Sequence, residues 1–307
     1  MAWAWDAPSG VYKNHALSQK IRRAAIAKTV FMNYVTPEPG YGKGRGESIT
    51  ITRFDNLPLA GQVSEIDRLP SVRPTITTKQ QAVAEWGSKM EMTEFEKNLT
   101  SFDLRNQYQM MLRDQIRLTM DKMVADAMKT TPYKYIPHSS TPGFDTDGTP
   151  STTADVNLDV ADVLNIRDEL MGTLKVPPFA NGMYIGILST KAARGIRNDS
   201  TYRDWLAPST FEPFTTGMLK PIENIALIET NHFDALSNGV GSGSILGEAL
   251  FFGMDAAFLA VVQQPELRAG IPDDLGRFRQ FGWVGTIQAG LTWEQAATSR
   301  VIHVTSA

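Results

Sequence analysis

The sequence predicts an α+β fold that combines one very long helix, several alternating strands and a compact lobe of mixed structure. Three observations predict it. Residues 94–129 contain neither Pro nor Gly and place apolar side chains three to four positions apart. Residues 48–54, 82–92 and 278–291 alternate apolar with polar side chains. Between residues 159 and 253, short helical and strand patterns follow one another.

Composition limits the classes of function that the chain can serve. The 307 residues are 42% hydrophobic and 21% charged, a globular balance. No stretch approaches the roughly 18–20 apolar residues of a membrane span, and MAWAWDAPSG lacks the basic-then-apolar order of a secretory signal. With no cysteine, disulfides, thiolate metal sites and Cys nucleophiles are excluded. The four histidines show no metal-ligand spacing.

Positive charge is concentrated at the start of the chain. Residues 1–46 carry seven basic side chains against Asp6 and Glu38, which leaves +5 there and −8 on residues 47–307. The basic residues are Lys13, Lys20, Arg22, Arg23, Lys28, Lys43 and Arg45. Such an arm could contact nucleic acid, dock on an acidic neighbour, or be a solvated helix. Apolar spacing predicts a short helix over 16–28, and VTPEPGYGKGRG then predicts a flexible hinge.

A projecting loop is predicted between two strands. SITITRF at 48–54 alternates as a strand does, and residues 82–92 form a half-buried strand. Between them, three prolines and mixed charges disfavour a core element. Apolar side chains there favour contact with a neighbouring subunit, and nearby charges would set its register; the alternative is a loop folded back on its own subunit. These residues are Leu57, Leu59, Val63, Glu65, Ile66, Asp67, Arg68, Leu69 and Arg73.

The long helix is predicted to begin at a capping box and to continue to Lys129. Thr93 and Glu96 have the spacing of that box. At about 1.5 Å per residue, 94–129 would give a rod of roughly 50 Å. Its outer side would hold Arg105, Asp114, Arg117 and Asp121. The stripe that packs on the core includes Met111 and comprises chiefly Leu104, Tyr108, Leu112, Ile116, Met120 and Met123.

The compact lobe is predicted from a series of short patterns. Asp159 can cap a helix whose inner face holds Val163, Ile166, Leu170 and Leu174. Buried strands are expected at 183–188, 224–229 and within 245–253, and a last strand at 301–305. The DTDG run at 145–148 lacks the glutamate of a calcium loop, so we reject a calcium site.

No catalytic pattern is present. The chain has no GxSxG, P-loop or GxGxxG motif. His232 could act as a base, but a lone histidine is more often a satisfied turn residue. We therefore predict no catalysis, no metal and no cofactor. The combination of a basic arm, a projecting loop, a long helix and a compact lobe favours assembly.

Six segments along residues 40–305 form a recognisable series. Two of them, KGRGESITITRFDNLP and AVAEWGSKMEMTEFEKN, precede the long helix. Four follow it: NGMYIGILSTKAARGIRNDSTYRDW, PIENIALIETNHF, ILGEALFFGMDAA and GRFRQFGWVGTIQAGLTW. In this order the segments resemble tailed-bacteriophage (podophage-type) major capsid proteins of the Hong Kong 97 fold. The chain is short for this family, so we expect surface insertions of relatives to be absent.

The resemblance implies a division of the chain into parts. Residues 1–46 would be the N-terminal arm, 47–92 the extended E-loop with its flanking strands, and 93–130 the spine helix of the peripheral (P) domain. Residues 131–264 would form the axial (A) domain, and 265–307 the C-terminal strands of the P domain.

The resemblance also implies partners. The chain would assemble with itself, as hexamers and pentamers, into an icosahedral virion shell around double-stranded DNA, in the host cytoplasm and without a membrane. A separate scaffold, a portal and a cement protein would be further partners. An encapsulin-like nanocompartment shell shares the fold and stays an alternative, as does an enzyme with an unrecognised site.

Overall fold

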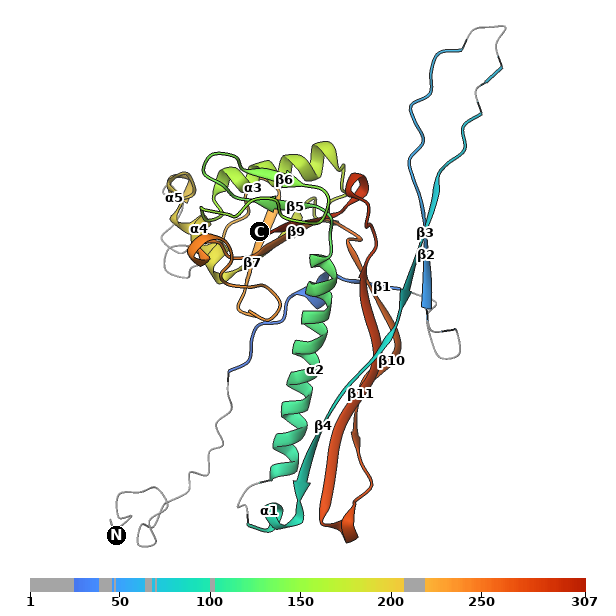
Figure 1. Ribbon diagram of the computed structural model, residues 1–307, viewed down its shortest axis with the longest axis vertical. Helices are drawn as coiled ribbons and strands as arrows, with labels where there is room; N and C mark the ends of the chain where they lie inside the picture. Colours follow the sequence, from blue (N-terminus) through green and yellow to red (C-terminus); the bar gives the residue numbers. More distant parts are fainter. Residues whose placement is uncertain are drawn as a thin grey trace.

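The computed structural model describes residues 25–38, 46, 48–63, 68–69, 71–99, 103–206 and 219–307. The molecule is elongated (Figure 1). A compact lobe lies at one end of a spine made of helix α2 (Leu104–Lys129) and long strands, and a two-stranded arm projects beside the lobe. Within the described ranges, no helix has the length and apolar character needed to span a bilayer.

The spine sheet has four strands in the order β1-β10-β11-β4. Strand β11 pairs antiparallel with both β10 and β4, in register from Phe278 opposite Thr93 to Ile287 opposite Ala84. The strand predicted at 278–291 is confirmed, because burial alternates along it as the sequence does. The strands are β1 (Thr36–Pro37), β4 (Ala84–Thr93), β10 (Ala257–Ala269) and β11 (Phe278–Leu291).

The long helix is interrupted, so the prediction of one rod over 94–129 is wrong. The structure has α1 (Glu94–Leu99) and α2 (Leu104–Lys129). The predicted capping box is confirmed by reciprocal hydrogen bonds of 3.1 Å between Thr93 and Glu96. A second cap explains the break: Asp103 is non-helical, and its carboxylate accepts the Asn106 N–H at 3.3 Å. The 26 residues of α2 span about 39 Å.

Helix α2 packs against the spine sheet through the predicted stripe. Leu112 is buried with Trp283 and Met92, and Leu104, Tyr108 and Ile116 pack against that cluster. Met120 and Met123 join the cluster between the helix and the lobe. Two assignments to the faces of the helix are wrong. Met111 is exposed, and Asp121 is fully buried, because the segment at 28–32 covers that side of the helix.

The projecting element is a hairpin. Strands β2 (Ser48–Phe54) and β3 (Ile76–Ala82) pair from Ser48 opposite Ala82 to Phe54 opposite Ile76. Residues 76–80, predicted as loop, therefore belong to a strand, and the connecting segment is 55–75. A single residue, Val83, separates β3 from β4. We call residues 48–82 the hairpin arm.

The lobe is built on a six-stranded mixed sheet in the order β6-β5-β12-β9-β7-β8. The predicted Asp159 cap is confirmed, and Val163, Ile166 and Leu170 below it are fully buried. The strands are β5 (Lys134–Ile136), β6 (Gly143–Asp145), β7 (Tyr184–Ser189), β8 (Ile225–Thr230), β9 (Ala249–Phe252) and β12 (Val301–Val304). The helices and helical turns are α3 (Val160–Asp168), η2 (Glu169–Thr173), α4 (Thr190–Asn198), α5 (Ser200–Leu206), η3 (Ser242–Ser244) and η5 (Ala296–Thr298).

The sheets do not follow the predicted boundary between residues 264 and 265. Strand β10 crosses that point as one strand of the spine sheet. Strand β12 pairs with β9 and β5 of the lobe. The prediction had placed it, with the rest of residues 265–307, in the P domain. The lobe sheet buries all four residues of β12, and such a short apolar run carries no periodicity that names its partner.

Candidate interaction surfaces

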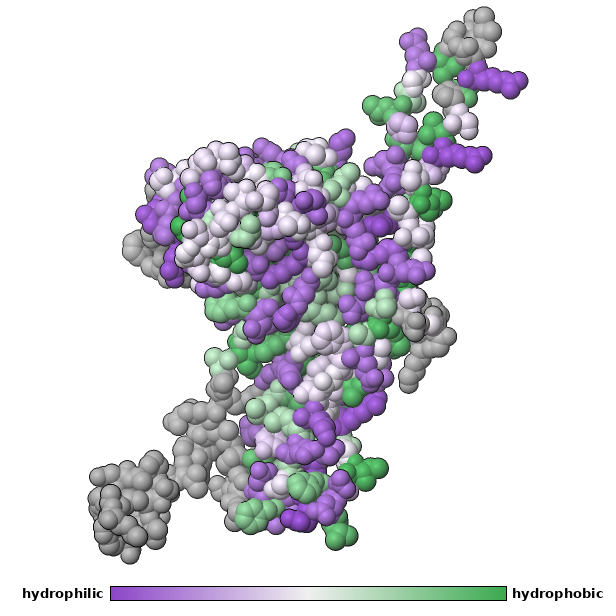
Figure 2. All heavy atoms as spheres, in the orientation of Figure 1, coloured by the Kyte–Doolittle hydropathy of each residue, from purple (hydrophilic) through white to green (hydrophobic). Residues whose placement is uncertain are grey.

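The hairpin arm carries a concentration of exposed apolar side chains. Green spheres stand out along it in Figure 2, beside purple charged residues. Leu59 is 99% exposed and Leu69 is 82% exposed. Because isolated subunits rarely leave so many large apolar groups in water, the arm is a candidate contact surface. Its exposed apolar residues are Phe54, Leu57, Leu59, Val63, Leu69, Val72 and Ile76.

The predicted arm residues that the structure describes are all exposed in the single subunit. Arg68 and Arg73 are exposed, as are the predicted leucines and Val63. Glu65, Ile66 and Asp67 lie outside the described residues. Phe54, Val72 and Ile76 were missed, although the apolar ends of the two arm strands could have indicated Phe54 and Ile76 from the sequence.

Of the basic arm, the structure describes only Lys28, which is exposed. Residues 25–30 are not helical, so the predicted helix does not continue to residue 28. The other predicted basic residues lie outside the described residues: Lys13, Lys20, Arg22, Arg23, Lys43 and Arg45.

The backbone at residues 28–32 is firmly anchored. Asp121 accepts the N–H of Val30 at 2.9 Å and that of Met32 at 3.3 Å. The Lys28 N–H donates to Asn231 at 2.6 Å, and Thr230 donates to the Lys28 carbonyl at 3.0 Å. The start of the described chain is therefore fixed between α2 and the loop after β8. η1 (Phe31–Tyr34) follows directly.

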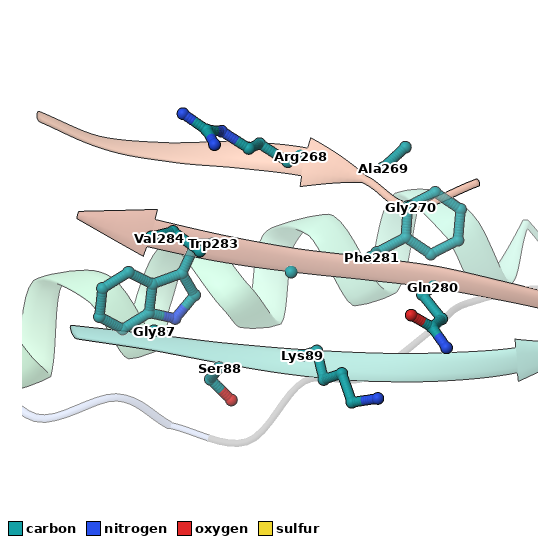
Figure 3. A pocket seen from close by; sticks show the side chains of 11 residues that line it. Gly87, Ser88, Lys89, Arg268, Ala269, Gly270, Gln280, Phe281, Trp283 and Val284 are labelled. Atoms are coloured by element: carbon teal, nitrogen blue, oxygen red, sulfur yellow. The ribbon is translucent and has the colours of Figure 1, made fainter. Parts of the chain in front are cut away.

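A shallow groove of about 500 Å³ crosses the spine sheet (Figure 3). Glycines form part of its floor, and Lys89, Arg268 and Gln280 stand around it. A Cβ at Gly87 would lie 2.7 Å from the Trp283 carbonyl oxygen, so β4 and β11 approach more closely than side chains there would permit. The groove exposes sheet backbone between polar rims.

A second exposed apolar group lies at the end of the spine far from the lobe. Phe95 on α1 is 74% exposed, and Ile271 and Leu275 on the β10–β11 connection are 89% and 103% exposed. Helix α1 lies beside that connection in Figure 1, and the Glu94 N–H donates to the Arg277 carbonyl at 2.8 Å. The turn η4 (Asp274–Gly276) places Leu275 at φ 58°, a left-handed conformation that few leucines adopt. This tip was not predicted from the sequence.

Buried charges lie between α2 and the lobe. Glu248 accepts Lys129 Nζ at 2.6 Å and the Ser237 N–H at 2.7 Å, and its other oxygen lies 3.4 Å from His303 Nε2. Lys134 Nζ lies 3.2 Å from His303 Nδ1. These groups join β5, β12, the start of β9 and the end of α2.

Burial has strong electrostatic effects in this cluster. It lowers the pKa of His303 to about 4 although Glu248 opposes the change, and it lowers the pKa of Lys134 to about 8. Burial alone would raise the pKa of Glu248, but the hydrogen bond and charge of His303, together with those of Lys129, outweigh it and lower that pKa to about 2. None of the four residues lines the spine-sheet groove or the cavities beside α2 and beside Trp293, so we interpret the cluster as a structural joint.

His232, the candidate base, is 3% exposed and bonded to Asp121. It is thus a satisfied histidine in a turn. Among the described residues, no group of three or more His, Asp or Glu side chains could hold a metal ion. The structure brings together no set of groups that resembles a catalytic site within those ranges.

No family model matches the chain, and no curated protein matches it. The chain does match solved structures. The chain is similar to a chain of the cyanophage Pam1 capsid at 14% identity and TM-score 0.72, with 96% of this chain and 97% of that chain covered. It is similar to the capsid of Helicobacter pylori bacteriophage KHP30 at 12% identity and TM-score 0.72, with 97% of each covered. The capsid of a native GTA particle matches at 11% identity and TM-score 0.64, covering 99% of each chain.

These similarities extend over nearly the whole of both chains, so they define the complete fold. The chain has the Hong Kong 97-type fold of tailed-phage capsid proteins, which confirms the predicted fold class.

Proposed function

We propose that this protein is the major capsid protein of a tailed bacteriophage, a structural subunit without catalysis. Subunits would associate as hexamers and pentamers into an icosahedral shell that encloses double-stranded DNA. The observation that carries the proposal is the hairpin arm, whose large apolar side chains are exposed in the isolated subunit. The capsid fold of the structural neighbours supports it.

Each part of the molecule receives a role under this proposal. The hairpin arm with residues 55–75 is the E-loop, α2 and the spine sheet form the P domain, and the lobe is the A domain. Apolar contact to a neighbouring subunit would come from Leu57, Leu59, Val63, Ile66 and Leu69. Each contact would contribute about 1–2 kcal/mol. The charges on Glu65, Asp67, Arg68 and Arg73 would set the register more than the affinity.

The groove on the spine sheet is the receiving surface that we assign to a neighbouring arm. Its floor exposes sheet backbone at Gly87 and Gly282. On its rim, Lys89 pairs with Glu91 and Arg268 with Glu266, so the rim carries charges of both signs. The arm also carries charges of both signs, so opposite charges on the two surfaces would set the register of the contact.

Other partners follow from the same proposal. The basic residues of 1–46 would contact packaged DNA without sequence specificity. A separate scaffold protein, a portal and a cement protein would take part in assembly in the host cytoplasm, and the mature protein would reside in the virion capsid.

The arm gives the sharpest test. Replacing residues 58–73 by a short Gly-Ser linker removes most of the apolar surface but keeps the 3.1 Å bond between the Asp55 N–H and the Thr75 carbonyl. We expect a folded subunit with near-unchanged circular dichroism that forms no shells by electron microscopy. The double variant Leu59→Ser, Leu69→Ser should have the same defect with less change to the chain.

A matched control is Phe233→Ser with Met254→Ser, which changes two exposed apolar residues outside the arm. It should assemble normally. Normal shells from both arm variants would overturn the role of the arm. A wild-type chain that stays monomeric by light scattering at all salt concentrations and with scaffold would overturn the capsid function.

A further inference from the structure

The hairpin arm is joined to the body by few regular contacts. Within the described ranges, β2 and β3 form a sheet of two strands that is separate from the spine sheet and from the lobe sheet. The chain passes from the arm into the spine sheet through Val83, the single residue between β3 and β4. The direction of the arm must therefore depend on side chains of its two paired strands, β2 and β3. We call these paired strands the root of the arm.

Two cations at the root contact the same short segment, residues 291–294. Arg53 on β2 is 8% exposed and donates to the Thr292 carbonyl at 2.7 Å. Its guanidinium lies 5.8 Å from the ring centre of Trp293. Lys79 on β3 pairs with Glu294 and donates to the Leu291 carbonyl at 3.2 Å. Both arm strands are thus held by one connection between β11 and the lobe.

Trp293 is in turn fixed to the lobe. Its indole N–H lies 3.4 Å from Asp255, and the Arg300 guanidinium lies 4.3 Å from its ring centre. Arg300 also donates to the Met254 carbonyl at 3.0 Å. The Trp293 ring is therefore held in a fixed position on the body, and the Arg53 guanidinium of the arm lies over it.

Open space lies on both sides of this contact. A cavity of about 440 Å³ separates β3 from α2, with Lys79 and Gln81 on one wall and Asp126 and Thr130 on the other. A second cavity of about 350 Å³ separates residues 54–56 from Lys175 and its neighbours in the lobe. These two cavities provide space beside the paired strands into which the arm could move.

We propose that Arg53 and Lys79 are positioning residues that form a releasable clamp on residues 291–294 and thereby set the direction of the hairpin arm. This inference rests on the proposed function, since the direction of the arm determines which neighbouring subunit it reaches. The buried Nε of Arg53 has no hydrogen-bond partner among the described residues, so the guanidinium is only partly satisfied in this position. Release of the clamp would allow the arm to swing toward either cavity, as hinged elements do about a few residues.

The test measures the arm in the unassembled full-length subunit, so its result does not depend on shell formation. The chain has no cysteine, so Leu59→Cys on the arm and Thr146→Cys on the lobe permit two specific spin labels. Both positions are exposed. In this background we compare Arg53→Met and Lys79→Met with Arg73→Met, which removes an exposed arginine of the arm away from the root.

We expect one narrow distance distribution for the parent and for Arg73→Met. Arg53→Met should broaden the distribution about twofold, because the arm then rotates about its remaining connections. Lys79→Met should have a smaller effect in the same direction, and circular dichroism should stay unchanged. If Arg53→Met fails to fold, Lys79→Met still decides the matter. If Arg53→Met and Lys79→Met both fold and keep a distance distribution as narrow as the parent's, the clamp is overturned. If a variant keeps the narrow distribution but forms no shells, the result concerns the proposed role of the arm in assembly and not the clamp.

Discussion

Asp121 in α2 and His232 after β8 share a buried hydrogen bond of 3.1 Å between residues 111 positions apart. The same carboxylate accepts the N–H groups of Val30 and Met32. Three segments therefore meet at one side chain: the spine helix, the lobe and the first part of the described chain. This junction gives the first prediction.

Asp121→Ala should destabilise the subunit by about 2–4 kcal/mol, since the buried Val30 N–H, the partly buried Met32 N–H and His232 lose their acceptor. Residues 28–32 should become sensitive to limited proteolysis. Asp126→Ala, which changes an exposed carboxylate of the same helix, is the control, and its denaturation midpoint should stay near that of the parent. Equal stabilities for the two variants in urea titrations would contradict this anchoring role.

Mild acid should weaken the joint between α2 and the lobe. Burial lowers the pKa of His303 from 6.5 to about 4. Between those pH values the unfolded chain binds a proton at His303 that the folded chain does not, so the free energy of unfolding falls as the pH falls. The loss is on the order of 3 kcal/mol when the full interval is crossed. Glu248, whose pKa is lowered to about 2, adds a loss of the same sign below pH 4.5.

Urea titrations at pH 7 and pH 5 measure this effect. His303→Gln removes the titrating group, so its midpoint should depend less on pH than that of the parent. His138→Gln changes a partly exposed histidine in the lobe and should keep the parent's pH dependence. A pH dependence unchanged in His303→Gln would show that His303 is not the responsible group.

Gly87→Ala should strain the spine sheet. The added Cβ would lie 2.7 Å from the Trp283 carbonyl oxygen, which belongs to the backbone of the neighbouring strand and cannot move alone. We expect a loss of about 1–3 kcal/mol in thermal or urea unfolding. Gly172→Ala, where nothing lies within 4 Å of the added Cβ, is the control and should show no such loss. If Gly87→Ala leaves the free energy of unfolding unchanged, β4 and β11 lie further apart in solution.

Ile116→Pro should bend α2 near its middle. Proline removes a backbone N–H from the helix and clashes with the preceding turn, at a cost of about 3 kcal/mol or more. Because α2 packs along the spine sheet, we expect assembly to fail in electron micrographs. Arg117→Ala, at the exposed neighbouring position, should form normal shells. Normal shells from Ile116→Pro would show that assembly does not need a straight spine helix.

Much of the fold can be predicted from local patterns. Strand β11, the Thr93–Glu96 box and the Asp159 cap depend on residues close together in the chain, and periodicity or spacing reveals them. The exposed leucines of the arm were likewise predictable, because apolar residues in a proline-broken segment have no face of a helix or strand to occupy.

The tertiary structure alone decided the remaining features. The long helix is divided because Asp103 caps the start of α2, and no Pro or Gly in the sequence marks this break. Asp121 looks like a solvent-facing charge until residues 28–32 and His232 cover it. Strand β12 pairs with a strand of the lobe sheet. Arg53 contacts Trp293, which lies 240 positions further along the chain. The sequence by itself determined those local elements whose partners are neighbours in the chain, such as β11, the Thr93–Glu96 box and the Asp159 cap. Partners far apart in the chain were set by packing, because the free energy of a long-range contact depends on shapes and charges that exist only once the elements are assembled.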